Sequence, residues 1–125
     1  MKMTWNRLEK ICTEAELLVE ERRPQLARHL PEKLKWNLDL VSKKTIESLP
    51  KTKELNQWSL GFVALCKPRG SSFDIVIAND LETEEEYLLA LVHEILHACL
   101  FFKGFRNWNN EDVVERMTQR IMILP

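Results

Sequence analysis

Two histidines and a glutamate lie within five consecutive positions, as His93, Glu94 and His97, in the pattern H-E-x-x-H. Residues four apart on a helix lie on one face, about one turn apart, so both imidazoles can point at one ion. Imidazole nitrogens are common ligands of zinc. Glu94 follows the first histidine directly, and from there it can take a proton from a water at the metal. The pattern therefore predicts a zinc site with Glu94 as its general base.

The residues around this motif favour the zinc interpretation over a chance occurrence. Apolar residues fill positions 87–92 before the motif and 98–102 after it. A helix that is apolar on all sides is buried, and buried His and Glu side chains are unfavourable unless they have partners. A metal ion supplies that partner and gives Glu94 a role. The alternative is a pair of structural histidines beside a solvated glutamate.

A catalytic zinc ion needs a third protein ligand, and no His follows His97. The nearest later acids are Glu111, Asp112 and Glu115, all in the first turns of the last predicted helix. A short loop makes the two final helices antiparallel neighbours, which brings these acids back toward His97. We predict Glu111 as the ligand and Glu115 as the acceptor for the N–H of a ligating histidine, with Glu115 as the alternative ligand. If both acids only stabilise a helix N-terminus, then His29, Asp112 or a partner chain must supply the third ligand.

Hydrophobic periodicity predicts the elements that position these residues. An amphipathic helix is expected over residues 4–23, followed by a connector or one further helical piece over residues 24–31. Alternating patterns predict strands at residues 34–41, 58–66 and 73–78, the last two joined as a hairpin by a turn at 67–72. Residues 42–57 are ambiguous, and 43–49 can form a helical turn. Thr83 begins the motif helix with a capping box, Gly104 ends it, and Asn109 or Asn110 caps a last helix that runs to about residue 122.

Composition limits the function classes that need consideration. The chain has 125 residues, a length that predicts one domain over residues 1–125. A net charge of −1 gives no reason to expect a nucleic-acid or membrane partner. The start of the chain lacks the apolar segment of a signal peptide. The three cysteines, Cys12, Cys66 and Cys99, are widely spaced and form no C-x-x-C pair, which indicates reduced thiols in a cytoplasmic protein.

The motif and the acids that follow it resemble a known group of enzymes. Residues 91–98, Leu-Val-His-Glu-Ile-Leu-His-Ala, and 111–115, Glu-Asp-Val-Val-Glu, are similar to the small gluzincin metallopeptidases, in particular phage-encoded ones. ImmA/IrrE-type and SprT-like domains are more distantly similar. The resemblance covers residues 73–124 and, more loosely, the preceding hairpin. It implies an α+β minimal zincin fold with an N-terminal helix, a small three-stranded sheet, the H-E-x-x-H helix and a C-terminal glutamate helix.

The resemblance also implies site residues, with some departures from the family pattern. It implies zinc bound by His93, His97 and a downstream glutamate, with Glu94 as the base. Glu115 stands where the family has Asp or Asn, and the gap from His97 to Glu111 is shorter than in many gluzincins. The third histidine and the zinc ribbon of SprT-like domains are missing. These departures leave both Glu111 and Glu115 as candidates for the third ligand.

The leading functional hypothesis is a zinc-dependent peptidase acting on a peptide or protein substrate. The substrate would pair in extended form with a sheet-edge strand, for which we expect Phe73, Asp74, Ile75, Val76 and Ile77. One alternative is a non-catalytic binding or regulatory protein that keeps zinc for structure, which the small size favours. An intact Glu94 argues against that alternative, because a structural site needs no base. Another alternative is a zinc hydrolase that acts on a non-peptide amide.

Overall fold

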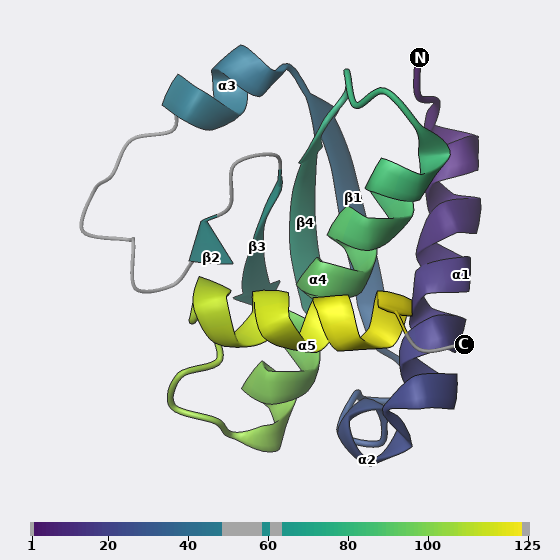
Figure 1. Cartoon of the computed structure of the whole chain (residues 1–125). Helices are drawn as coiled ribbons and strands as arrows, with labels where there is room; N and C mark the ends of the chain where they lie inside the picture. Colours follow the sequence, from purple (N-terminus) through teal and green to yellow (C-terminus); the bar gives the residue numbers. More distant parts are fainter. Residues whose placement is uncertain (1, 49–58, 61–63, 124–125) are drawn as a thin grey trace.

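A four-stranded mixed sheet forms one layer of the protein in a computed structural model that describes residues 2–48, 59–60 and 64–123 (Figure 1). Its strands are β1 (Lys35–Val41), β2 (Ser59–Leu60), β3 (Ala64–Arg69) and β4 (Ser72–Ala78), in the spatial order β1-β4-β3-β2. β1 runs parallel to β4, and the other pairs are antiparallel. The α+β class is confirmed, and β1 and β4 match the strands predicted at 34–41 and 73–78. The strand predicted at 58–66 instead covers β2 and the first half of β3. Part of the predicted strand at 58–66, residues 58 and 61–63, lies outside the described residues.

One face of this sheet packs against the helices and contributes to the core. Phe73, Ile75 and Ile77 alternate along β4 and are fully buried, as the period of two predicts. Directly opposite Ile75 lie Leu38 of β1 and Cys66 of β3, so the three strands present apolar side chains to the same side. Cys66 is fully buried at the centre of this face.

Two predictions about the hairpin strands are wrong. The segment Phe73 to Ile77 was expected at a sheet edge, but β4 pairs with β1 along one side and with β3 along the other. Its backbone groups are therefore used within the sheet and cannot pair with a substrate strand. The predicted turn at residues 67–72 is also too long, because β3 continues to Arg69 and the turn consists of Gly70 and Ser71. Gly70 has φ of 59°, a value that glycine adopts without strain.

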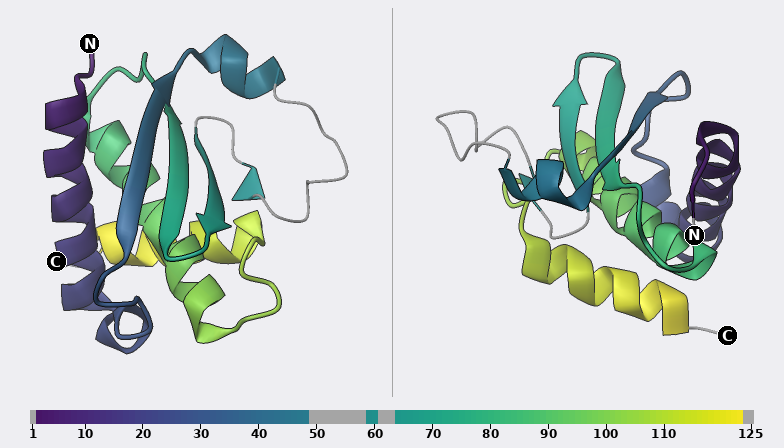
Figure 2. Two further views of the ribbon diagram at one scale, coloured as in Figure 1. Left: turned by 180° about the vertical axis from the view of Figure 1, so that it is seen from behind. Right: turned by 90° about the horizontal axis from the view of Figure 1, so that it is seen from above.

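The helices pack in two further layers on the core side of the sheet (Figure 2). α1 (Trp5–Arg22) and α4 (Glu84–Lys103) pack against each other and against the strands, and α5 (Glu111–Ile123) lies on α4. The short helices α2 (Pro24–Ala27) and α3 (Lys43–Ser48) complete the described elements. Each fits its predicted region, although position 49 lies outside the described residues. No described helix is both long enough and apolar enough to cross a membrane.

The ends of the long helices follow the predicted capping residues. Thr4 and Thr83 accept hydrogen bonds from the backbone N–H groups of Arg7 and Glu86, three residues later. Gly104 ends α4 in the left-handed conformation, with φ of 86° and ψ of 20°. The chain then returns, and α5 crosses α4 obliquely instead of lying strictly alongside it (Figure 1). This crossing brings only the first turns of α5 close to the histidines of α4.

Candidate metal centre

α4 holds the H-E-x-x-H residues in the interior of the protein. From Leu91 to Leu100 every residue is buried, and His97 is fully enclosed while His93 is 9% exposed. The apolar neighbours that predicted burial therefore do enclose the motif. Because the helix packs against α1, the sheet and α5, its orientation is fixed on several sides. The two imidazoles are thus presented in a fixed direction, with ring centroids 4.8 Å apart.

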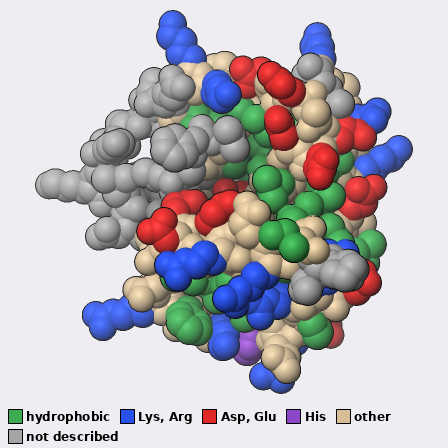
Figure 3. Space-filling model, in the orientation of Figure 1, with side chains coloured by type: hydrophobic (Ala, Val, Ile, Leu, Met, Phe, Trp, Pro, Cys, Tyr) green, Lys and Arg blue, Asp and Glu red, His purple; other side chains and the backbone are tan. Residues whose placement is uncertain are grey.

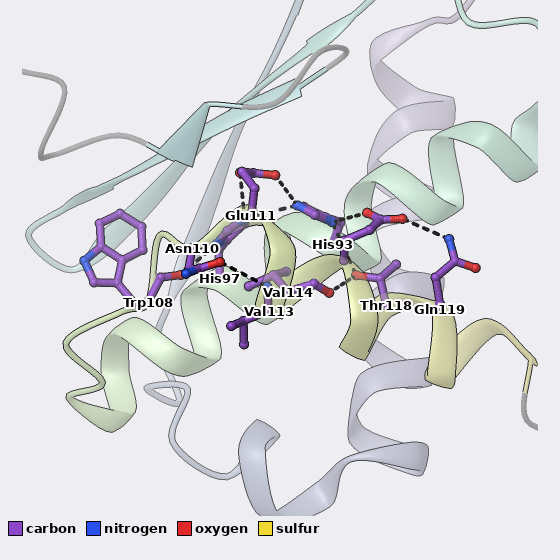
Figure 4. Close-up of polar contacts among 10 residues, drawn as sticks. His93, His97, Trp108, Asn110, Glu111, Val113, Val114, Thr118 and Gln119 are labelled. Carbon is purple, nitrogen blue, oxygen red and sulfur yellow. Dashed lines mark hydrogen bonds and ion pairs between the residues drawn. The ribbon is translucent and has the colours of Figure 1, made fainter.

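α5 supplies the third residue of the group. Asn110 caps this helix by accepting a hydrogen bond from the N–H of Val113 at 3.1 Å, which places Glu111 in the first turn (Figure 4). Glu111 Oε2 lies 2.8 Å from Nε2 of His93, and Glu111 Oε1 lies 3.0 Å from Nε2 of His97. The two Nε2 atoms are 3.1 Å apart. Two imidazole nitrogens and a carboxylate therefore converge on one point between α4 and α5.

The other ring nitrogens point away from this convergence. His97 Nδ1 lies 2.7 Å from the carbonyl oxygen of Trp108, and a carbonyl can only accept, so Nδ1–H donates. His93 Nδ1 lies 3.0 Å from Oε2 of Glu115 and 3.4 Å from the hydroxyl of Thr118. That hydroxyl donates to the carbonyl of Val114 at 2.8 Å, which leaves its oxygen to accept from His93. In the neutral form of each ring, the Nε2 lone pair is therefore directed into the site.

A second contact orients Glu115, which is half exposed. Gln119 donates from Nε2 to Glu115 Oε1 at 2.9 Å, so the carboxylate is held between Gln119 and His93. Glu111, Glu115 and Thr118 follow the spacing of four and then three residues. That spacing puts all three on the edge of α5 that faces the histidines.

The carboxylates around His93 favour its protonated form. Burial alone would lower the pKa of His93, but the hydrogen bond to Glu111 and the charges of Glu94, Glu111 and Glu115 outweigh it, so the pKa is raised. The protonated ring donates from Nε2 toward Glu111 and from Nδ1 toward Glu115. A proton on Nε2 thus competes with a metal ion for the lone pair of the same nitrogen.

The spacing and chemistry of the three groups fit a metal ion. Ligand atoms of a tetrahedral zinc ion, each about 2.0–2.1 Å from the metal, lie about 3.3 Å from one another. The two Nε2 atoms are 3.1 Å apart, and each lies 2.8 or 3.0 Å from a different oxygen of Glu111. With one ligand atom taken from each residue, all three lie within 4.8 Å of one another, so small movements would bring them to the spacing of zinc ligands. Among the described residues, His93, His97 and Glu111 are the group that could hold a metal. Two nitrogen donors and one carboxylate form a set that suits zinc and leaves a fourth position for water.

Glu94 lies beside this group without joining it. Its side chain is 2% exposed, and its Oε2 has no hydrogen-bond partner among the described residues. Burial raises the pKa of Glu94, while the neighbouring His97 and His93 and a hydrogen bond from the Cys66 thiol act in the opposite direction. A buried carboxyl with an unoccupied oxygen beside two histidines can accept a proton in a poorly solvated environment.

The structure brings together most, but not all, of the residues named from the sequence. His93, His97 and Glu111 converge, and Glu115 contacts the outer nitrogen of His93 as predicted. His29 and Asp112, the reserve candidates, are not members of the group. Sequence reasoning missed three further contributors, which are Thr118, the Trp108 carbonyl and Cys66. The position of Thr118, seven residues after Glu111, was a usable signal because it lies on the same helix edge. The sequence gives no comparable signal for the other two, because the Trp108 group is a backbone carbonyl and Cys66 lies on a strand distant in sequence.

Comparison of the chain with protein-family models, with curated proteins and with solved structures finds no match. The functional argument therefore depends on the geometry of the site and on the sequence motifs that form it.

Proposed function

We propose that the protein is a zinc-dependent metallopeptidase in which His93, His97 and Glu111 hold the metal and Glu94 acts as the general base. The observation that carries the proposal is the convergence of three possible ligand groups. Nε2 of His93, Nε2 of His97 and the carboxylate of Glu111 lie together, while the Nδ1 atom of each histidine has another partner, the Trp108 carbonyl for His97 and Glu115 for His93. The likeness of residues 91–98 and 111–115 to gluzincins supports the same assignment.

The side chains divide the chemistry between them. Zinc, when bound, would polarise the scissile carbonyl and lower the pKa of a coordinated water. Glu94 would accept a proton from that water and pass it to the leaving amine nitrogen. Burial favours this transfer, because it raises the pKa of the Glu94 carboxyl toward that of its proton donor. Glu115 and Thr118 would hold His93 in the tautomer that keeps Nε2 free for the metal.

A second candidate is a non-catalytic protein that keeps zinc for structural stability. The low exposure of Glu94 and His97, 2% and 0%, favours it, because a catalytic water and a substrate must reach both groups. The two candidates differ in the role they give to Glu94. A structural site gains nothing from a buried, ionisable carboxyl, whereas a hydrolase requires it.

Metal analysis combined with a hydrolysis assay tests the proposal. The purified protein should contain about one zinc per chain, and a His97→Ala variant should lose it. Unfolded casein should be cleaved by the zinc-loaded protein, and a chelator should abolish cleavage. Zinc bound at this stoichiometry with no hydrolysis of casein or short peptides would favour the structural candidate. Stoichiometric zinc remaining in a His93→Ala/His97→Ala variant would remove the site from this motif.

A further inference from the structure

A groove of about 570 Å³ lies on the edge of α5 that is turned away from the candidate metal centre. It is bounded by the C-terminal ends of α1 and α4, by α2, and by Val113 and Met117 of α5. These two residues lie one turn apart, and each is about half a turn around the helix from Glu111 or Glu115. α5 therefore separates the groove from the metal-binding residues.

The lining of the groove includes the apolar residues Pro24, Leu26, Leu100, Phe105, Val113 and Met117, and part of this apolar surface is exposed. Leu26 and Leu100 are nearly buried at the floor, with 9% and 4% exposure. Phe105 and Val113 are 50% and 39% exposed, which makes them two of the large hydrophobic side chains that solvent reaches most among the described residues. Exposed aromatic and aliphatic side chains around a concave surface are typical of a binding site.

Positive charge surrounds this apolar surface. Arg22, Arg23 and Lys103 line the groove, and its described lining includes no carboxylate. Arg116 and Arg120 are exposed and follow Val113 and Met117 by three residues, so they extend the positive edge along α5. The side chain of Arg22 also donates to the carbonyl of Ile121, which fixes its position.

The surface over and below α5 is richer in basic than in acidic side chains on the side shown in Figure 3. Lys and Arg side chains lie there and also along the upper part of the view, whereas most Asp and Glu side chains lie above α5. The chain as a whole has a net charge of −1, so the positive face is a local feature. Such a face raises the local concentration of anionic partners and speeds their association.

We propose that this groove binds a short acidic peptide segment that carries one bulky apolar side chain. The apolar side chain would lie against Leu26, Leu100 and Met117, and flanking carboxylates would pair with Arg23 and Lys103. The apolar floor distinguishes this partner from a nucleic acid, whose phosphates would need only the positive edge. The inference goes beyond the proposed peptidase activity, because it uses no residue of the metal centre.

Fluorescence anisotropy with a labelled peptide of alternating Asp or Glu and Leu or Phe tests this inference. The titration uses the zinc-loaded Glu94→Gln protein, so that cleavage cannot consume the probe. We expect saturable binding that weakens as sodium chloride is raised. Reversing two charges, in Arg23→Glu/Lys103→Glu, should weaken binding about tenfold or more, and Phe105→Ala should weaken it several-fold. Lys35→Glu/Lys44→Glu, an equal charge change at exposed positions on β1 and α3, should leave the affinity within about twofold.

Several results would overturn the inference. They are an absence of saturable binding, equal binding of a peptide with Lys in place of the acids, and tighter binding of a single-stranded oligonucleotide that the same variants abolish. Circular dichroism and thermal melting show whether the charge-reversed variant is folded, and Arg23→Gln/Lys103→Gln gives a milder version with an intermediate loss. Because anisotropy measures binding alone, failure of the hydrolysis assay leaves this test unaffected.

Discussion

Alanine substitutions at Glu111 and Glu115 should separate a metal ligand from a residue that orients a ligand. Among the described carboxylates, Glu111 is the member of the metal group, and its oxygens lie 2.8 and 3.0 Å from the Nε2 atoms of His93 and His97. Its removal therefore leaves two ligands. Structural zinc sites with four ligands bind with about 10–16 kcal/mol, or roughly 3–4 kcal/mol for each ligand. Glu111→Ala should therefore lower zinc affinity by several hundredfold, at about 1.4 kcal/mol for each factor of ten.

Glu115→Ala should have a much smaller effect. The Glu115 side chain is 53% exposed, so water can take its place as acceptor for the His93 Nδ1–H. Thr118 already lies 3.4 Å from the same nitrogen and offers a second acceptor. Loss of such an orienting partner lowers metal affinity by about 10–100-fold. Because water and Thr118 can both replace the lost acceptor, we expect Glu115→Ala to lower zinc affinity by about tenfold. A Glu115→Ala/Thr118→Val double variant should approach a hundredfold.

Competition with a chromophoric zinc chelator at fixed pH measures these affinities. Asp112→Ala is the matched control, because Asp112 is an exposed acid on the same helix and is not a member of the candidate metal group. Its affinity should stay within about twofold of wild type. A larger loss in Glu115→Ala than in Glu111→Ala would show that Glu115 closes the site. Negligible losses in both would mean that neither is a ligand.

Three further predictions concern the base, the proton in the site and the end of α4. Glu94→Gln should keep zinc and the fold but lose casein hydrolysis, because an amide cannot accept the proton; turnover at the wild-type rate would refute this mechanism. The raised pKa of His93 stabilises the metal-free fold fully below about pH 6.5, and that stabilisation is lost as pH rises through the folded-state pKa. Thermal melts with a chelator should therefore show falling stability above about pH 6.5, less steeply in His93→Gln, while zinc affinity rises over the same range. A Cβ atom added at Gly104 would meet no atom within 4 Å. Gly104→Ala should therefore lower the free energy of unfolding by about 1 kcal/mol, or Tm by about 4 °C, because of the positive φ alone. A Tm unchanged in this variant would show that the left-handed turn is not needed.

The parts of the site that depend on local patterns were predictable. Thr83, the surrounding apolar residues and Gly104 identify α4 and its burial from neighbours a few positions away. The periodicity of α5 likewise places Glu111 and Glu115 on one edge of that helix. Helix caps and helix faces are determined by residues within one or two turns, so neighbouring positions in the sequence predict them.

Contacts between distant segments were not predictable in the same way. The hairpin pattern identifies the strands that became β3 and β4, but nothing in it indicates that β1 adds to the far side of β4 and makes β4 central. The contact between Cys66 and Glu94 depends on how β3 lies over α4. The hydrogen bond from His97 to the Trp108 carbonyl depends on the path of the loop backbone, and the side chains of the loop do not specify that path. Such contacts follow from the packing of elements far apart in the chain.

The enclosure of α4 has a consequence for how the site can be altered. Because nearly every side of this helix is in contact with the rest of the protein, a substitution there disturbs several neighbours at once. α5 lies on the surface, and only its inward edge, which includes Val114, Thr118 and Ile121, is buried. The histidine half of the site is thus constrained, whereas the glutamate half is open to change. We therefore expect redesign of the metal preference, for example through Glu111→His or Glu111→Asp, to be tolerated through α5 and not through α4.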